Sequence, residues 1–297
     1  MFLYSSEPLN GKVWGLALLR RFCICAVFGV LLPVLLSAEA ATAPNYQDPQ
    51  TLDRGFRQMY SLDFAAAHAT FLSYQQTHPA DPRGHVSNAA AYLFSEFDRL
   101  HILESDLFLD DKTFDGRKKR TPDPAVKMEL EKELAKSDEL AAKVLAQKPD
   151  DENALFSQVM ANGLRGDYAA LIEKRNLASL AYMKTGRTIA LKLLAIDPTC
   201  YDAYLAIGVE NYLLGTNPAP VRWVLRMTGA QTDKQEGLQR LRLTADKGRY
   251  LAPFARLLLA VAALRDKDRP TARTLLAGLA KEFPGNQLYV TELARIQ

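Results

Sequence analysis

The residues with the most obvious chemical potential gather in one stretch of the chain. All four histidines lie in this stretch, and they are His68, His78, His85 and His101. His101 and Glu104 stand three residues apart and would share one face of a helix. A tetrahedral zinc site needs four ligands at characteristic spacings, and no such spacing occurs here. The histidines are therefore expected at surface or capping positions, and no metal or cofactor is predicted.

Two neighbouring segments imitate binding motifs without completing them. Asp111 and Asp115 begin as a calcium-binding loop begins, but the twelfth position is Pro122, where calcium needs a bidentate glutamate. The basic run at residues 117–120 follows, and the nearby aspartates nearly neutralise it. We interpret this run as a solvated loop, and a contact with anionic lipid or an acidic partner is the alternative.

Catalytic motifs are missing from the sequence. It contains no H-E-x-x-H, no phosphate-binding G-x-x-x-x-G-K and no G-x-S-x-G. We therefore predict that the chain is not an enzyme. The alternative is a small-ligand binder or an enzyme whose cleft uses Glu210, Asp202 or His101. Such a protein would have a closed pocket with carboxylates or histidines at one end.

Composition limits the class of protein further. The 297 residues are 48% hydrophobic and 24% charged, as in an ordinary folded protein. The 37 lysines and arginines against 34 aspartates and glutamates give a net charge of only +3. Because binding to phosphates needs a concentrated basic surface, a nucleic-acid partner is not expected.

The first forty residues have the pattern of an export signal. Arg20 and Arg21 precede an apolar run over residues 22–36, which ends in the small-residue pattern of Ala38 and Ala40. The run is shorter than the roughly 18 to 20 residues that cross a bilayer as a helix. We predict a signal peptide over residues 1–40 and a folded domain over residues 41–297. The protein is then exported to the periplasm or envelope, with an uncleaved membrane anchor as the alternative.

The rest of the chain has a helical pattern. Residues 123–147, 167–196 and 253–266 are rich in alanine, leucine, lysine and glutamate, with apolar residues every three or four positions. No β-branched alternation bounded by turn residues occurs. The expected fold class is all-α.

One spacing recurs four times in the helical region. Each copy has a small residue twelve positions before a proline, as in the pairs Ala67 and Pro79, Ser137 and Pro149, Gly186 and Pro198, and Ala272 and Pro284. Ten residues after each proline come Ala89, Val159, Gly208 and Ala294. Small residues let helices approach closely, and proline ends a helix. The pattern predicts helix pairs stacked in a solenoid.

These features resemble the tetratricopeptide repeat (TPR) family, of the exported bacterial type. The TPR unit is a 34-residue helix-turn-helix with a late alanine and a closing proline. The closing prolines here are 70, 49 and 86 residues apart. We therefore expect lengthened helices over residues 85–108 and 167–196, a turn at residues 166–168 and an insertion at residues 216–231. The resemblance implies a right-handed α-α solenoid of irregular TPR-like helix pairs, serving protein–protein interaction along an extended groove.

The best candidate binding surface lies beside the insertion. Tyr201, Leu205, Val209 and Tyr212 follow helical spacing on the first helix of a repeat, which in the TPR family lines the concave face. In the insertion, Trp223 belongs to a broad apolar face. This segment either contacts a membrane or a protein partner of unknown identity, or it packs back over the groove, which is our preferred interpretation.

Overall fold

The computed structural model describes residues 52–104, 121–217 and 232–296, with a few single residues between 217 and 232. The expected signal peptide, the calcium-like loop and the basic run lie outside the described residues. All the described residues belong to the unit Ala43–Gln297. Within them, no helix combines the length and apolar character needed to cross a bilayer.

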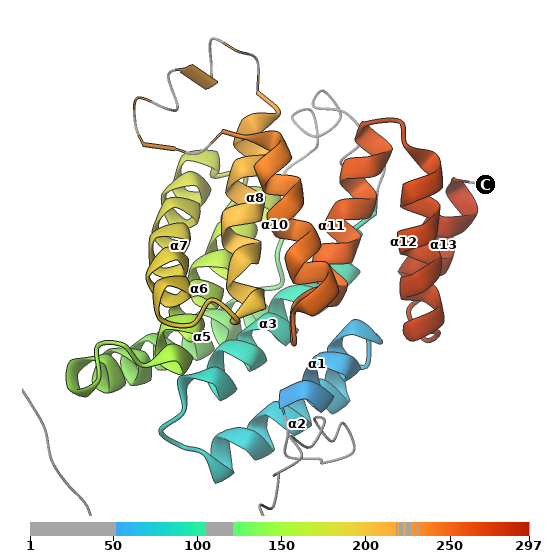
Figure 1. The fold of residues 1–297 in the computed structure, drawn as a ribbon. Helices are drawn as coiled ribbons and strands as arrows, with labels where there is room; N and C mark the ends of the chain where they lie inside the picture. Colours follow the sequence, from blue (N-terminus) through green and yellow to red (C-terminus); the bar gives the residue numbers. More distant parts are fainter. Residues whose placement is uncertain are drawn as a thin grey trace, which may run out of the picture. The chain divides into compact units, whose positions relative to one another are not determined.

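The elements of the described residues are all helical, which confirms the all-α prediction (Figure 1). The α-helices are α1 (Leu52–Tyr60), α2 (Phe64–Thr77), α3 (Pro82–Arg99), α5 (Pro124–Gln147), α6 (Glu152–Asp167), α7 (Asn176–Ile196), α8 (Tyr204–Gly215), α10 (Lys234–Lys247), α11 (Ala252–Arg265), α12 (Arg269–Glu282) and α13 (Gln287–Arg295). A π-helical segment, Tyr168–Ile172, follows α6, and a 3-10 turn, Tyr201–Ala203, precedes α8. Each helix packs against the next one along the chain, which makes an α-solenoid of stacked helix pairs.

The closing prolines end the helices as predicted. Helices α2, α5, α7 and α12 all stop two residues before their proline. At three of these four junctions, the residue two positions after the proline caps the next helix. Asp81 accepts a hydrogen bond from Arg83 N, and Asp151 and Asn286 cap α6 and α13 in the same way. Proline and cap together make a sharp junction between one helix pair and the next.

The first helix of several pairs ends on a left-handed residue that is not glycine. Leu62 after α1, His101 after α3 and Lys267 after α11 have φ values of 62°, 53° and 62°. In each case the next amide reaches back over the last turn, as Ile102 N does to Phe97 O at 2.9 Å. This is the hydrogen-bond pattern of a Schellman cap, in which glycine usually occupies the left-handed position. These helix ends therefore lack the glycine that would mark them in a sequence.

Two predicted helix boundaries are wrong. The turn expected at residues 166–168 is helical, because α6 continues through Gly166 and Asp167 into the π-helical segment. The chain turns instead at residues 173–175, where Lys174 has a φ of 58°. The helix expected over residues 85–108 ends at Arg99. Neither observed boundary contains the glycine or proline that usually marks a helix end, so the sequence gives no local signal for either of them.

Most of the predicted small residues lie at close helix contacts. Ala67, Ser137, Ala272 and Ala89 are at most 1% exposed, whereas Ala294 is exposed. The tightest contact joins α8 to α10. A Cβ added to Gly208 would lie 3.0 Å from Leu241 N, and one added to Gly237 would lie 2.4 Å from Tyr212 N. Glycine is needed at these positions because the two backbones nearly touch.

We expect Gly208→Leu to lower the free energy of unfolding by about 1 to 3 kcal/mol, since the new side chain overpacks the contact between α8 and α10. Gly278→Leu on α12 is the matched control, because nothing lies within 4 Å of its Cβ position. It should raise stability by about 0.5 to 1 kcal/mol through helix propensity. Urea denaturation measures both, and equal midpoints for the two variants would contradict the close contact.

Candidate functional site

The predicted row on α8 is part of the packed interior. Tyr212 is buried in a cluster with Leu238 and Leu241 of α10, and Leu205 and Val209 pack partly buried against the same cluster. Tyr201, just before α8, is half-buried and stacks near Tyr204, with the Lys247 ammonium 5.1 Å from its ring centre. The structure therefore brings Leu205, Val209 and Tyr212 together as a contact between helices.

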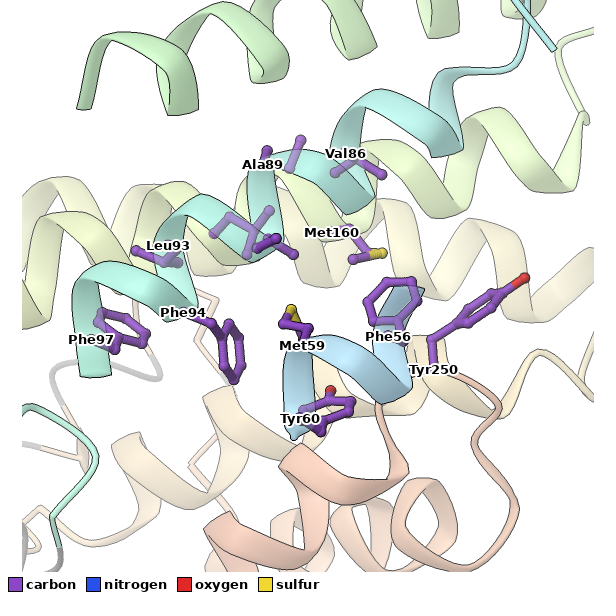
Figure 2. Close-up of a cluster of buried hydrophobic side chains, with 14 of the residues drawn as sticks. Phe56, Met59, Tyr60, Val86, Ala89, Leu93, Phe94, Phe97, Met160 and Tyr250 are labelled. Atoms are coloured by element: carbon purple, nitrogen blue, oxygen red, sulfur yellow. The ribbon is translucent and has the colours of Figure 1, made fainter. Parts of the chain in front are cut away.

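The inner face of the helix stack is filled by the chain itself. Phe56, Met59 and Tyr60 of α1 are almost fully buried. Phe56 and Met59 face α3 and α6, and Tyr60 lies on the side of α1 nearer the C-terminal helices (Figure 2). The Phe56 ring lies 4.9 Å from that of Tyr250, and the Tyr60 ring lies 5.8 Å from that of Phe283. Helix α1 thus joins the first helix pair to the last ones. The extended groove expected from the TPR resemblance is therefore not present along α1, whose apolar side chains are buried against the C-terminal segments.

Polar contacts hold α1 in this position. Arg249 donates two hydrogen bonds to the buried carboxylate of Asp53, at 2.7 and 2.6 Å. Arg57 pairs with Glu282 at 3.2 Å. Asn286, the cap of α13, donates from Nδ2 to the backbone oxygen of Tyr60 at 2.8 Å. Both ends of α1 are therefore bound to the C-terminal third of the chain.

Asp202 orders the loop that carries Arg249, the partner of Asp53. Its carboxylate accepts hydrogen bonds from the backbone N–H groups of Arg249, Tyr250 and Leu251, at 3.0 to 3.1 Å. Burial raises the pKa of Asp202, and the three donors oppose that rise. Asp202 thus orders the loop that presents Arg249 to Asp53. Sequence reasoning singled out Asp202 as a cleft residue and did not identify Asp53.

The other residues of the enzyme alternative have separate partners. Glu210 is buried on α8 and pairs with Arg187 Nε at 2.9 Å. His101 is exposed and lies 3.1 Å from Glu104. No contact joins Asp202, Glu210 and His101, so the described residues contain no shared catalytic group built from them. Nor do histidines, cysteines and acidic residues form a cluster there that is able to hold a metal ion.

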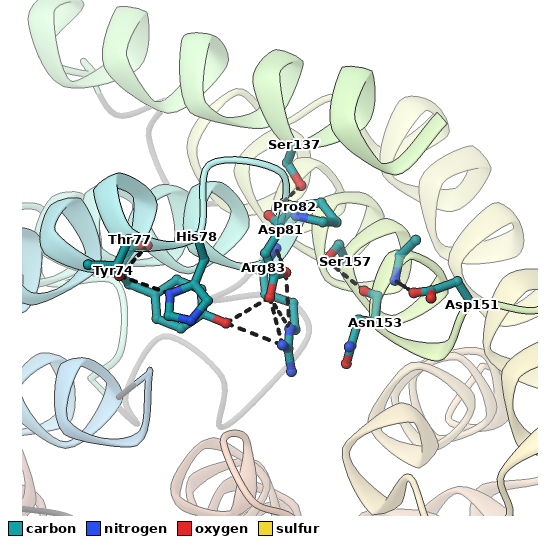
Figure 3. A network of polar contacts seen from close by, with 11 residues as sticks. Tyr74, Thr77, His78, Asp81, Pro82, Arg83, Ser137, Asp151, Asn153 and Ser157 are labelled. Atoms are coloured by element: carbon teal, nitrogen blue, oxygen red, sulfur yellow. Dashed lines mark hydrogen bonds and ion pairs between the residues drawn. The ribbon is translucent and has the colours of Figure 1, made fainter. Parts of the chain in front are cut away.

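The remaining histidines make local structural contacts. His78 stacks on Tyr74 with ring centres 4.3 Å apart, beside a network in which Tyr74 donates to Asp81 and Arg83 binds both (Figure 3). His85 and Glu133 pair at 2.7 Å. The pKa of Tyr74 is raised mainly by burial and also by its hydrogen bond to Asp81, so the phenol stays protonated. The network stiffens the junction between α2 and α3.

Cys200 is not activated for chemistry. Burial, followed by the negative charge of Asp202, raises the pKa of its thiol to about 12. The thiolate is the reactive form of cysteine, and it is almost absent at neutral pH when the pKa is this high.

A cavity of about 220 Å³ remains where α1, α3, α11 and α13 do not fully close. Aromatic and aliphatic side chains make its walls, among them Phe94, Phe97, Phe254 and Leu257. Polar residues also line it, and they include Asp98 at the end of α3 and His101 and Glu104 in the segment that follows. The cavity has the charged end that the small-ligand alternative predicts, although Asp202 and Glu210 take no part in it.

The insertion exposes two large apolar side chains. Trp223 is 64% exposed and Met227 is 70% exposed. Arg222 donates to the backbone oxygens of Gly215 and Asn217 at 3.4 and 3.1 Å, which ties the segment to the end of α8. Our preferred interpretation, in which Trp223 packs back over the groove, is therefore wrong.

Comparison with known proteins gives little guidance. No family model matches the chain, and no curated protein matches it. Among solved structures, the chain is similar to a thermophilic TPR protein of Thermus thermophilus, with 15% sequence identity and a TM-score of 0.42 over 85% of this chain and 98% of that one. The helix-pair architecture described above rests on the order and contacts of the helices themselves.

The contact between Asp53 and Arg249 is open to a direct test. We expect Arg249→Met to lower the free energy of unfolding by about 1 to 3 kcal/mol, because it leaves the buried Asp53 carboxylate without its donors. Adding Asp53→Asn should cost less than the sum of the single changes, since the buried charge is then gone.

Arg175→Met is the control, because Arg175 is exposed in its pair with Glu173 and should change stability by less than about 1 kcal/mol. Thermal and urea denaturation measure all these variants. Strict additivity of the two substitutions would show that Asp53 and Arg249 are not coupled.

Proposed function

We propose that this protein is an exported, non-enzymatic helical-repeat scaffold that binds a protein partner at the cell envelope. The observation that supports this proposal most directly is the exposure of three large apolar side chains at the end of α8 and in the insertion that follows it. We call these residues the α8 tip, and they are Leu213, Trp223 and Met227.

The composition of the α8 tip is typical of a protein-binding surface. Tryptophan and methionine are enriched at interfaces, where the indole supplies a large rigid contact and methionine adapts its shape. The three side chains are 45%, 64% and 70% exposed, in that order along the chain. Helix α1 occupies the inner face that binds peptides in TPR proteins. A partner would therefore dock on the outside of the stack.

Export is supported by two features of the sequence. The first forty residues have the charged, apolar and small-residue regions of a signal peptide. Cutting there removes Cys23 and Cys25 and leaves Cys200 alone.

The α8 tip is tested by affinity capture from envelope extracts of the source cells, with the wild-type protein and variants as bait. We expect a partner captured by the wild type to be lost with Trp223→Ala and with Met227→Ala, with little change in folding stability. Met128→Ala on α5 is the matched control, because Met128 is 60% exposed and lies on another helix.

Two outcomes contradict this assignment of the binding surface. If all four baits capture the same proteins, the α8 tip takes no part in binding. A blue shift of Trp223 fluorescence on adding lipid vesicles alone would indicate a peripheral membrane contact in place of a protein partner.

The export step is tested by mass spectrometry of the mature amino terminus. We expect it at Ala41 or within a few residues, because Ala38 and Ala40 supply the small side chains that signal peptidase accepts. An intact N-terminal segment recovered with the membrane fraction would instead support the uncleaved anchor.

A further inference from the structure

The cavity between α1, α3, α11 and α13 has no assigned role in the scaffold function. Its walls come from segments far apart in the sequence, including Met59 of α1, Phe94 of α3, Leu257 of α11 and Tyr289 of α13. None of the α8 tip residues lines it. A ligand here would therefore be independent of the proposed partner surface.

The size of the cavity limits the ligand. An engineered apolar cavity of about 150 Å³ in another protein stays dry and binds benzene. The cavity in this chain measures about 220 Å³. It has room for a single aromatic ring or a short alkyl chain with a small polar group attached.

The charged side chains that line the cavity limit the ligand further. Glu104 is 3.0 Å from Arg295 and 3.1 Å from His101, and Arg295 also pairs with Glu292 at 2.6 Å. Asp98 is exposed at the end of α3, and its carboxylate makes no hydrogen bond or ion pair to another described residue. Glu104 and Glu292 therefore neutralise Arg295, and no cation among the described residues pairs with the Asp98 carboxylate.

We propose that this cavity binds a small primary amine with an aromatic or alkyl body. The apolar part would lie between Phe94, Phe254 and Leu257, and the ammonium group would lie at the Asp98 carboxylate. An anion of the same shape is repelled by Asp98 and Glu104. A neutral molecule of the same shape gains the apolar contacts but no charge-assisted hydrogen bond.

The test is isothermal titration calorimetry of the full chain with three probes of similar shape, namely 2-phenylethylamine, 2-phenylethanol and 3-phenylpropionate. We expect the amine to bind about tenfold more tightly than the alcohol, because a hydrogen bond to an ionised partner is the stronger kind. The carboxylate should show no saturable binding. Equal affinity for amine and alcohol, or no saturable heat with any probe, would overturn the proposal.

Variants separate the charge from the apolar walls. Asp98→Asn should reduce amine affinity to that of the alcohol and leave alcohol affinity unchanged. Asp150→Asn is the control, since Asp150 is exposed and does not line the cavity. Thr291→Trp, at an exposed position of α13 that lines the cavity, should weaken both ligands at least tenfold by filling the space. Retained amine preference in Asp98→Asn would refute the role of this carboxylate.

Discussion

Burial of the apolar face of α1 is the interaction on which the rest of the structure depends. A nine-residue helix is too short to be stable alone, so α1 exists because Phe56, Met59 and Tyr60 pack among helices from both ends of the described chain. Asp53 and Arg57 add ion pairs to the C-terminal part. Together these contacts draw the last helix pairs onto the first one, and the inner face of the stack becomes core.

This closure changes what the helix stack is able to bind. In an open stack of helix pairs the inner face is available to a peptide, whereas here it is occupied by a segment of the same chain. Within the described part of the chain, we assign recognition to two places where apolar side chains meet solvent. One is the α8 tip, and the other is the cavity where α1, α3, α11 and α13 leave space unfilled.

The buried carboxylates of Asp53 and Asp202 support the contact between α1 and the C-terminal helices. Asp202 orders the loop before α11, that loop presents Arg249, and Arg249 neutralises Asp53 on α1. Both of these buried carboxylates therefore have donors, as a charge in a low-dielectric interior must. A sequence search for catalytic acids selects a residue such as Asp202 because it detects the residue type and does not detect its hydrogen-bond partners.

The sequence by itself determined the helical class, the helix stops at Pro79, Pro149, Pro198 and Pro284, and the close contact at Gly208. These features follow from local rules, since periodicity, missing amides and small side chains act within a few residues. Only the tertiary structure decided that α1 fills the inner face, that Tyr212 is core and that Trp223 is exposed. Those outcomes depend on contacts between distant segments, such as the one that joins Asp53 to Arg249 across 196 positions of the sequence. Such contacts are set by the packing of many helices together, and no local pattern in the sequence records them.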